Sequence, residues 1–297
     1  AASDVYKRQT MACIMPLYML RVLIKKLVFL YTVCKFGTKV CCTRPPYTFV
    51  DRTYHFFYNI SMYEEFVRSA AYWGADAMQK LYSAKIALFG VGGVGGWCAE
   101  ALARSGVGNI DLFDGDCVSL SNINRQAVAL HSTIGMPKAE VMAARIRDVN
   151  PAANVRAFNI FIDESSISVV RFEQYDYVLD AIDTVTSKVL IAERCVKEGV
   201  REVMCMGTGN KKDITSFRVA DISKTSVCPL ARAVRTLLRK RGIESGIKAV
   251  FSTELPAKNL VEDGPSSRHI PASIIFAPAA AGLIMAQTAV TDIIEKN

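Results

Sequence analysis

The feature that most constrains the fold is a glycine-rich run at residues 90–96, Gly-Val-Gly-Gly-Val-Gly-Gly. An apolar run at 85–89 precedes it, and a helical pattern at 94–105 follows it. Such a strand-to-helix turn lets the backbone approach a bound phosphate, and the N–H groups at the helix start supply donors and positive potential. The glycines expected to cradle a phosphate are Gly90, Gly92, Gly93 and Gly95. A tight turn without a ligand has the same pattern, so the loop alone does not decide the function.

The rest of the chain alternates short β-branched or aromatic runs with amphipathic stretches, which is typical of parallel strands joined by crossover helices. We expect further strands at 110–113, 177–181, 202–206, 216–220 and 248–252. We expect further helices at 137–149, 185–198 and 229–241. The predicted fold class is α/β, with a Rossmann-like, doubly wound and mostly parallel sheet that strands and helices of a C-terminal extension, about 208–297, continue.

Two C-terminal segments are less regular. Residues 254–268 are rich in Pro, Gly and Ser, which fits a flexible lid or a disordered connection. Residues 270–290 carry no charge, so a membrane span has to be considered. Pro271, Pro278 and the Ala/Gly-rich middle of this segment favour a buried strand followed by a packed helix.

The net charge of +8 is concentrated near the N-terminus, where residues 1–61 hold nine Lys or Arg and two acids. The remainder is nearly neutral, so overall basicity does not indicate RNA binding. Residues 1–9 resemble translated sequencing-adaptor sequence, and charged residues interrupt the apolar stretch at 14–33. We therefore expect 1–61 to be a non-native or read-through segment and not a membrane anchor, with Met62 as the true start.

The cysteines after residue 61 form no C-x-x-C pair. They are Cys98, Cys117, Cys195, Cys205 and Cys228. This spacing favours reduced thiols in a cytoplasmic protein, with neither a disulfide framework nor a structural zinc.

Polar side chains that suit a nucleotide follow the second expected strand. Asp114, at the strand's end, can accept the two ribose hydroxyls, as it would in an NAD enzyme as well. Amide and hydroxyl side chains and a guanidinium follow, at Ser121, Asn122, Asn124 and Arg125. Arg125 and Lys138, the latter at a helix start, are two cations that suit the pyrophosphate departing from ATP better than a nicotinamide ring.

Two acids, Asp180 and Asp183, lie at the carboxyl end of a later strand, the edge where open α/β sheets bind ligands. Asp183 is the better candidate for holding a magnesium ion that bridges phosphates, with Asp180 as a structural acid or cap. Asp183 could equally be the N-cap of the following helix.

This chain resembles the superfamily of ubiquitin-activating enzymes and the molybdopterin and thiamine adenylyltransferases. It has four of their motifs in the same order: Gly-x-Gly-Gly-x-Gly, Ser-Asn-x-x-Arg-Gln, Pro-Lys and Asp-x-x-Asp. Phrases at 99–108, 122–126, 138–143, 180–183 and 224–231 are similar to one branch, the tRNA threonylcarbamoyladenosine dehydratases, from about residue 62 to the C-terminus. The chain departs from the branch at 271–273, where Pro-Ala-Ser replaces Pro-Gly-Ser.

The resemblance implies an enzyme, an adenylate-forming cyclase, that uses ATP and Mg²⁺ to dehydrate threonylcarbamoyladenosine in tRNA through an acyl-adenylate of the threonine carboxylate. Because the attacking carbamoyl group is tethered to that carboxyl, no protein nucleophile is required. Arg125, Lys138 and Asp183 would be catalytic, and Asp183 would ligate magnesium. The resemblance also implies a cytoplasmic homodimer, in which Arg68 would reach the partner subunit's site, and sulfur-transfer proteins as further partners.

Three other functions stay open. An adenylyltransferase for a ubiquitin-like sulfur carrier would usually carry two C-x-x-C zinc pairs and a thiol-transfer cysteine, whereas Cys228 stands alone. A nicotinamide-dependent oxidoreductase leaves Asn122, Arg125 and Lys138 unexplained. A non-catalytic nucleotide-binding partner would not need Arg125, Lys138 and Asp183 together.

A basic helix is the best local feature for contact with tRNA. Its cationic residues are Arg232, Arg235, Arg239, Lys240 and Arg241, most of them spaced to share one face. A solvated helix face would have the same composition.

Overall fold

The computed structural model describes residues 64–259 and 271–295. All of them belong to the second of two units, 1–55 and 56–297, into which the chain divides. The expectations for residues 1–61, for Met62 and for most of the 254–268 segment concern residues outside these ranges.

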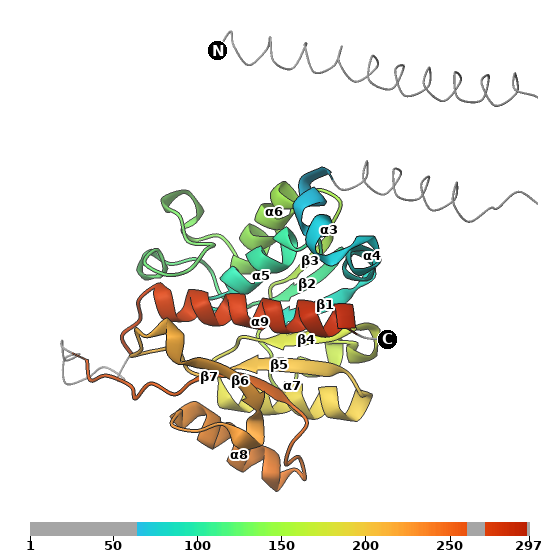
Figure 1. Ribbon diagram of the computed structural model, residues 1–297. Helices are drawn as coiled ribbons and strands as arrows, with labels where there is room; N and C mark the ends of the chain where they lie inside the picture. Colours follow the sequence, from blue (N-terminus) through green and yellow to red (C-terminus); the bar gives the residue numbers. More distant parts are fainter. Residues whose placement is uncertain (1–63, 260–270, 296–297) are drawn as a thin grey trace, which may run out of the picture. The chain divides into compact units, whose positions relative to one another are not determined.

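A seven-stranded sheet forms the centre of this part of the chain, in the order β3-β2-β1-β4-β5-β7-β6 (Figure 1). The strands are β1 (Lys85–Phe89), β2 (Asn109–Phe113), β3 (Asn154–Phe158), β4 (Tyr177–Asp180), β5 (Arg201–Cys205), β6 (Phe217–Asp221) and β7 (Lys248–Ser252). Neighbouring strands are parallel except β6, which is antiparallel to β7. The chain winds outward from β1 in one direction through β2 and β3 and in the other through β4 and β5, which confirms the predicted doubly wound α/β fold.

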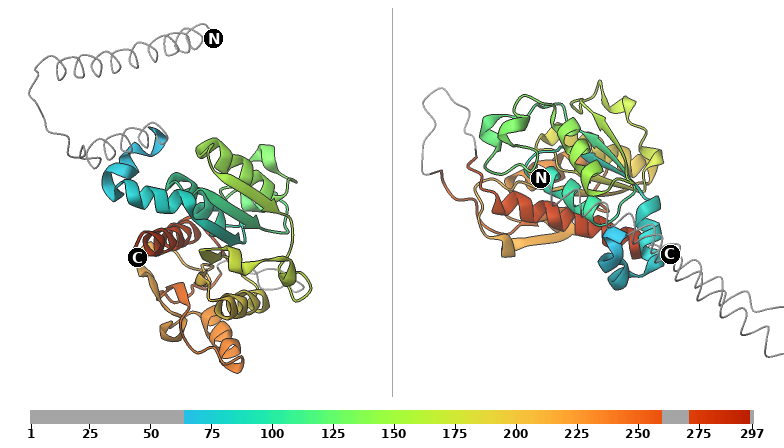
Figure 2. Two further views of the ribbon diagram at one scale, coloured as in Figure 1. Left: turned by 90° about the vertical axis from the view of Figure 1, so that its right-hand side faces the viewer. Right: turned by 90° about the horizontal axis from the view of Figure 1, so that it is seen from above.

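Helices cover both faces of the sheet (Figure 2). They are α3 (Val67–Trp73), α4 (Ala75–Ser83), α5 (Gly95–Arg104), α6 (Lys138–Val149), α7 (Val185–Glu198), α8 (Pro229–Lys240) and α9 (Phe276–Glu295). Single 3₁₀ turns occur at Glu64–Phe66, Leu120–Asn122, His131–Thr133, Ile167–Val169, Phe172–Gln174, Ile214–Ser216 and Ile222–Lys224.

Successive side chains of the central strands point to opposite faces of the sheet, so the buried core consists of separate clusters on the two faces. Ile86 and Leu88 of β1 belong to one buried cluster with residues of α4, α5, α6 and α9. Ala87 and Phe89 of the same strand belong to another cluster, which includes Ile191 of α7. Because both faces are covered, β1 reads as a continuous apolar run and not as an alternating one.

Most predicted elements lie within one residue of the observed bounds, but two expectations were wrong or incomplete. No strand forms at 271–275, where Ile274 and Ile275 are exposed just before α9 begins. Strand β3 was not predicted, because its polar residues Asn154 and Arg156 hide the apolar pattern of an edge strand.

Helix α9 crosses the sheet face directly over the start of α5. A Cβ on Gly282 would lie 2.3 Å from the carbonyl oxygen of Val94, so only glycine allows this close approach. Among the described helices, α9 alone is long and apolar enough to cross a membrane by length and composition, and half of its most apolar window is buried inside the protein. This arrangement agrees with the predicted packed helix.

Candidate functional site

The turn from β1 to α5 has the geometry of a phosphate cradle. Gly90 has φ +83°, and a Cβ on Gly95 would lie 1.8 Å from the carbonyl oxygen of Gly90, so the turn requires glycine at both positions. The N–H groups of Gly92, Gly93 and Val94 donate to no acceptor within the described residues. Three free amides at the N-terminus of a helix form an anion-binding site.

Asp114 closes one side of this turn from the end of β2. Its carboxylate accepts the N–H of Val91 at 2.6 Å and that of Asp116 at 2.9 Å. Burial raises the pKa of Asp114, and these two N–H groups partly offset the effect. The Val91 N–H therefore orients Asp114 and is not available to a phosphate, while the remaining lone pairs of the carboxylate can accept hydroxyl groups.

The side chain of Lys138, the first residue of α6, extends to the loop that follows β2. Its Nζ lies 2.7 Å from Oδ2 of Asp116, and the side chain is almost fully buried. A β-bridge between Cys117 and Pro137 holds the two segments together. Asp116 was not predicted to have a role, since nothing in its spacing indicates that it would pair with a residue 22 positions later.

Arg125 lies beside the glycine turn. Its Nη1 donates to the carbonyl of Ser121 and to Oδ1 of Asn124, both at 2.8 Å. Its Cγ lies 3.6 Å from the position that a Cβ on Gly93 would take. Only one guanidinium nitrogen is engaged, so the other N–H groups can bind an anion above the turn.

The amides near Arg125 have different surroundings. Asn122 is buried, and its Oδ1 accepts the N–H of Ser119 at 3.2 Å, so this oxygen shapes the loop. Asn124 is exposed, and its Nδ2 donates to the carbonyl of Ser273 at 2.9 Å. The hydroxyl of Ser121 is hydrogen-bonded to that of Ser119. Asn124, one of the predicted nucleotide ligands, therefore uses its amide N–H to bind the segment before α9.

Gln126 is a further candidate that the sequence interpretation did not single out, although it lies in the Ser-Asn-x-x-Arg-Gln motif. The side chain is buried, and its Oε1 has no hydrogen-bond partner within residues 64–259 and 271–295. Its Nε2 lies 3.9 Å from the position of a Cβ on Gly92. An unsatisfied buried amide beside the glycine turn fits a ligand that supplies the missing donor.

The turn after β4 places two acids in opposite environments. Asp180 is fully buried; it accepts the N–H of Ile182 and pairs with Lys188 at 3.1 Å. Asp183 is exposed and has no partner among the described residues. The N-cap of α7 is Thr184, so the interpretation of Asp183 as the cap is wrong.

The glycine turn and the β4 turn are in contact, because a Cβ on Gly90 would lie 2.9 Å from the carbonyl oxygen of Ala181. The structure therefore brings the glycine loop, Arg125, Lys138 and Asp183 to the carboxyl edge of β1, β2 and β4. No group of three His, Cys, Asp or Glu within 64–259 and 271–295 could hold a metal ion. A magnesium ion at Asp183 would need phosphate and water oxygens as its other ligands.

The other predicted site residues lie elsewhere. Arg68 is exposed on α3. On and just after α8, Arg232, Arg239 and Lys240 are exposed, whereas Arg235 bonds to Thr225 and Arg241 pairs with Glu193 of α7. The five cations therefore do not form one free face.

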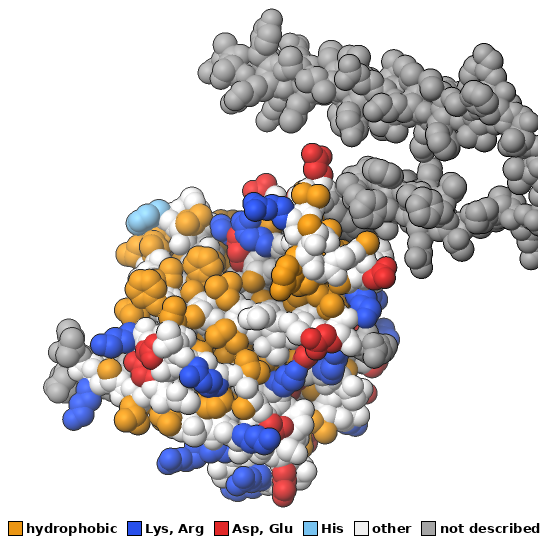
Figure 3. Space-filling model, viewed as in Figure 1, with side chains coloured by type: hydrophobic (Ala, Val, Ile, Leu, Met, Phe, Trp, Pro, Cys, Tyr) orange, Lys and Arg blue, Asp and Glu red, His pale blue; other side chains and the backbone are white. Residues whose placement is uncertain are grey.

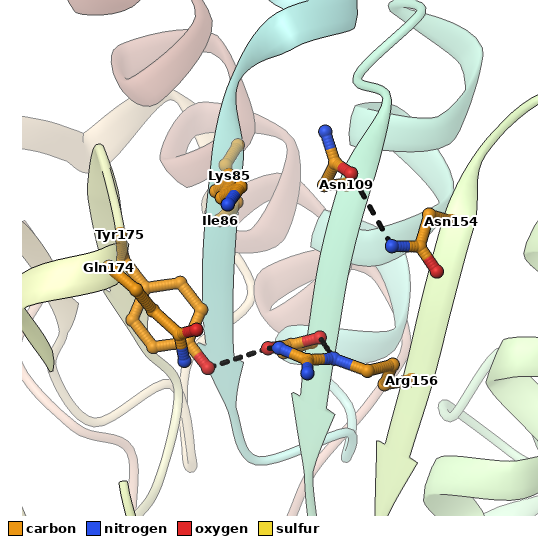
Figure 4. A pocket seen from close by; sticks show the side chains of 8 residues that line it. Lys85, Ile86, Asn109, Asn154, Arg156, Gln174 and Tyr175 are labelled. Carbon is orange, nitrogen blue, oxygen red and sulfur yellow. Dashed lines mark hydrogen bonds and ion pairs between the residues drawn. The ribbon is translucent and has the colours of Figure 1, made fainter. Parts of the chain in front are cut away.

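A small polar pocket of about 130 Å³ lies at the opposite, amino end of the strands (Figure 4). Its central acid, Asp111, is satisfied by Arg156 and by the hydroxyl of Tyr175 at 2.6 Å. The pocket is lined by residues at the starts of β1, β2 and β3, so it lies apart from the glycine turn, which follows the end of β1.

Comparison with known proteins adds three findings. Residues 66–297 match the ThiF family. The chain is 41% identical over 244 residues to the tRNA threonylcarbamoyladenosine dehydratase of Bacillus subtilis, covering 79% of this chain and 96% of that protein. It is similar to two crystal structures of the Escherichia coli enzyme of that name, TcdA, both 34% identical in sequence. The complex with AMP has a TM-score of 0.71, and the match covers 77% of this chain and 94% of that chain. The complex with ATP has a TM-score of 0.70, and the match covers 77% of this chain and 93% of that chain.

Proposed function

The chain belongs to the ThiF family, and from this premise we propose that it is an ATP-dependent tRNA threonylcarbamoyladenosine dehydratase. The observation that carries the proposal is the convergence of four separate motifs, around Gly90–Gly95, Arg125, Lys138 and Asp183, on one edge of the sheet. The identity to the Bacillus subtilis enzyme extends over nearly that whole protein, which supports the assignment to this branch.

In this proposal the free amides of the glycine turn bind the phosphates of ATP, and Asp114 accepts the ribose hydroxyls. Arg125 and Lys138 stabilise the negative charge that develops as pyrophosphate leaves. Gln126 and Asn122 complete the wall of the nucleotide site. Asp183 would hold Mg²⁺, which supplies further charge neutralisation at the phosphates.

The reaction removes one water in two steps. The threonine carboxylate attacks the α-phosphorus of ATP, and pyrophosphate leaves. A neighbouring carbamoyl atom then attacks the activated carboxyl carbon, a carbamoyl N–H loses its proton, and AMP leaves as the ring closes. Since both reacting groups belong to one side chain, the second step is intramolecular and needs no catalytic thiol.

A carrier-protein adenylyltransferase would need an accessible thiol for sulfur transfer. Cys228, the candidate for thiol transfer, is buried at the start of α8. A buried thiol behaves as a small hydrophobic group, which favours the dehydratase.

The partners follow from the same assignment. Exposed Arg232, Arg239 and Lys240 are suited to tRNA phosphates. We assign the homodimer contact to the apolar surface that α9 crosses, where Phe276 and Leu283 are exposed (Figure 3). Arg68 would then act in the partner subunit's site, the enzyme would work in the cytoplasm, and sulfur-transfer proteins would be further partners.

The test is incubation of the full chain with threonylcarbamoylated tRNA and Mg-ATP, followed by mass spectrometry of the nucleosides. A nucleoside lighter by one water, with release of AMP, is the expected result. Reactions without ATP and reactions with unmodified tRNA are the controls. An unchanged nucleoside would contradict the proposal, and pyrophosphate exchange with carrier proteins would then test the adenylyltransferase.

A further inference from the structure

A buried lysine, to which no role has been assigned so far, lies in the loop that follows β5. Lys211 is only 5% exposed, and its Nζ donates to the carbonyl oxygen of Ser252 at 3.2 Å. Its other charged or titratable neighbours are Cys205, Cys228 and Glu254. An ammonium group has three donors, so most of its hydrogen-bonding capacity is unused.

Lys211 also lacks a counter-ion. Within the described residues it forms no ion pair, and the nearby carboxylate of Glu254 is occupied by the backbone N–H groups of Lys212 and Asp213. Burial accordingly lowers the pKa of Lys211. A buried charge without a partner is costly, and an anion that arrives with a ligand would remove this cost.

Asn210, the residue before Lys211, has a side-chain acceptor that lacks a donor in the described part of the chain. The backbone of Asn210 is left-handed, with φ +57°, and it is fixed by hydrogen bonds to Ala272 and Ala257. Its side-chain Oδ1 is buried and accepts no hydrogen bond from any described residue. The loop therefore presents, one residue apart, a cation without an anion and an acceptor without a donor.

This loop is tied to the proposed nucleotide site by a short segment. The N–H of Asn210 donates to the carbonyl of Ala272 at 2.7 Å, and the next carbonyl, that of Ser273, accepts from Asn124. Asn124 in turn accepts from Arg125. Residues 272–273 thus join the loop after β5 to the residues around Arg125, on the same carboxyl edge of the sheet.

We propose that Lys211 binds the carboxylate of the substrate's threonyl group, and that Asn210 Oδ1 accepts the adjacent carbamoyl N–H. The inference rests on the proposed function, which supplies a substrate that carries both groups on one carbon atom, the α-carbon of the threonyl group. Lys211 would hold the carboxylate from the side of β5 and β7, facing the phosphates bound between β1 and β4.

The melting temperature of Lys211→Met distinguishes a purely structural role of Lys211 from a role in binding the substrate. If the lysine only stabilised the fold, Lys211→Met would lower the melting temperature. If it is retained for substrate, Lys211→Met removes an unpaired buried charge, so the melting temperature stays the same or rises.

The experiment compares the affinities of the full chain for threonylcarbamoylated and unmodified transcripts of one tRNA, without ATP. The wild type should prefer the modified tRNA, and Lys211→Met should reduce that preference at least tenfold with an unchanged or higher melting temperature. Lys211→Gln, which loses the charge but keeps a donor, should show the same loss. Lys212→Met is the matched control, because Lys212 is exposed; it weakens both tRNAs alike and keeps the preference.

Retention of the preference in Lys211→Met and Lys211→Gln would overturn the inference. A wild type that dehydrates the substrate but shows no preference for the modified tRNA would overturn it too, as would loss of preference together with a lower melting temperature in both variants. Failure of the wild type to dehydrate the substrate would instead contradict the proposed function, so the two failures are distinguishable.

Discussion

The loops at the carboxyl edge of the sheet differ sharply from the charged layer just beneath them. Asp183 is exposed and has no partner in the described part of the chain, and Arg125 has unused donors. Asp180, three residues before Asp183, is instead buried in the core against Lys188. Glu202 of β5 is also buried; it forms no ion pair within the described residues, and the thiol of Cys195 lies beside its carboxylate. Burial, with the nearby Asp180 as a second cause, raises the pKa of Glu202 well above its ordinary value.

This difference separates two uses of charge. Exposed groups cost little folding free energy and remain available to a ligand, while buried groups act on the stability and position of the strand end. Substitutions in the two sets should therefore affect different measurements. The following experiments test that separation.

The largest expected effect is on stability. Lys188→Met leaves the Asp180 carboxylate buried without a counter-charge, which should lower the free energy of unfolding by about 3–5 kcal/mol in urea titrations. Lys197→Met, at an exposed position of the same helix, is the control. The double variant Lys188→Met, Asp180→Leu should recover much of the loss, and a loss below about 1 kcal/mol in the single variant would show that the pair is not structural.

The exposed set should affect turnover instead. Arg125→Ala and Asp183→Ala each remove a group that we propose to act at the phosphates, so we expect kcat to fall by about 10²–10³-fold. Melting temperatures should stay at the wild-type value, and Asp148→Ala, an exposed acid on α6, should leave both quantities unchanged. Wild-type turnover in both site variants would contradict the site assignment.

Glu202 gives a pH-dependent test of the buried layer. Because its pKa is raised in the folded state, its contribution to stability is fully present below the ordinary Glu pKa and is lost as the pH rises through the folded-state pKa. In that window the free energy of unfolding should fall by up to about 1.4 kcal/mol per pH unit through this group. Glu202→Gln should remove the slope and be more stable than the wild type at pH 8.

Glu244→Gln, at an exposed position, should keep the wild-type slope. Identical pH profiles for Glu202→Gln and the wild type would mean that Glu202 is ionised in the folded state.

The smallest effect is expected at α8. Arg239→Ala and Lys240→Ala should together weaken tRNA binding severalfold, and each should reduce the slope of log affinity against log salt by about 1. Arg241→Ala is the contrasting variant, because Arg241 already pairs with Glu193 and should contribute less. If all variants have the wild-type slope of log affinity against log salt, α8 does not contact the tRNA.

The sequence alone determined those features that depend on local chemistry. The glycine turn could be predicted because Gly90 and Gly95 occupy positions where any Cβ would collide. Strand β1 could be predicted because it is a short continuous apolar run, and α7 because its apolar residues recur with helical periodicity. The motif order identified the family, and it predicted the residues that we propose to bind the phosphates. These signals lie within a few consecutive residues, where sterics and periodicity act directly.

Only the tertiary structure decided which distant groups become partners. The pairing of Lys138 with Asp116, the hydrogen bond from Asn124 to Ser273 and the burial of Lys211 all depend on segments that meet through the sheet. The segment at 271–275 and the edge strand β3 were misjudged for the same reason, because their conformation depends on neighbouring elements. A charged residue has the same local pattern whether it becomes exposed like Asp183 or buried like Asp180, and packing alone determines the difference.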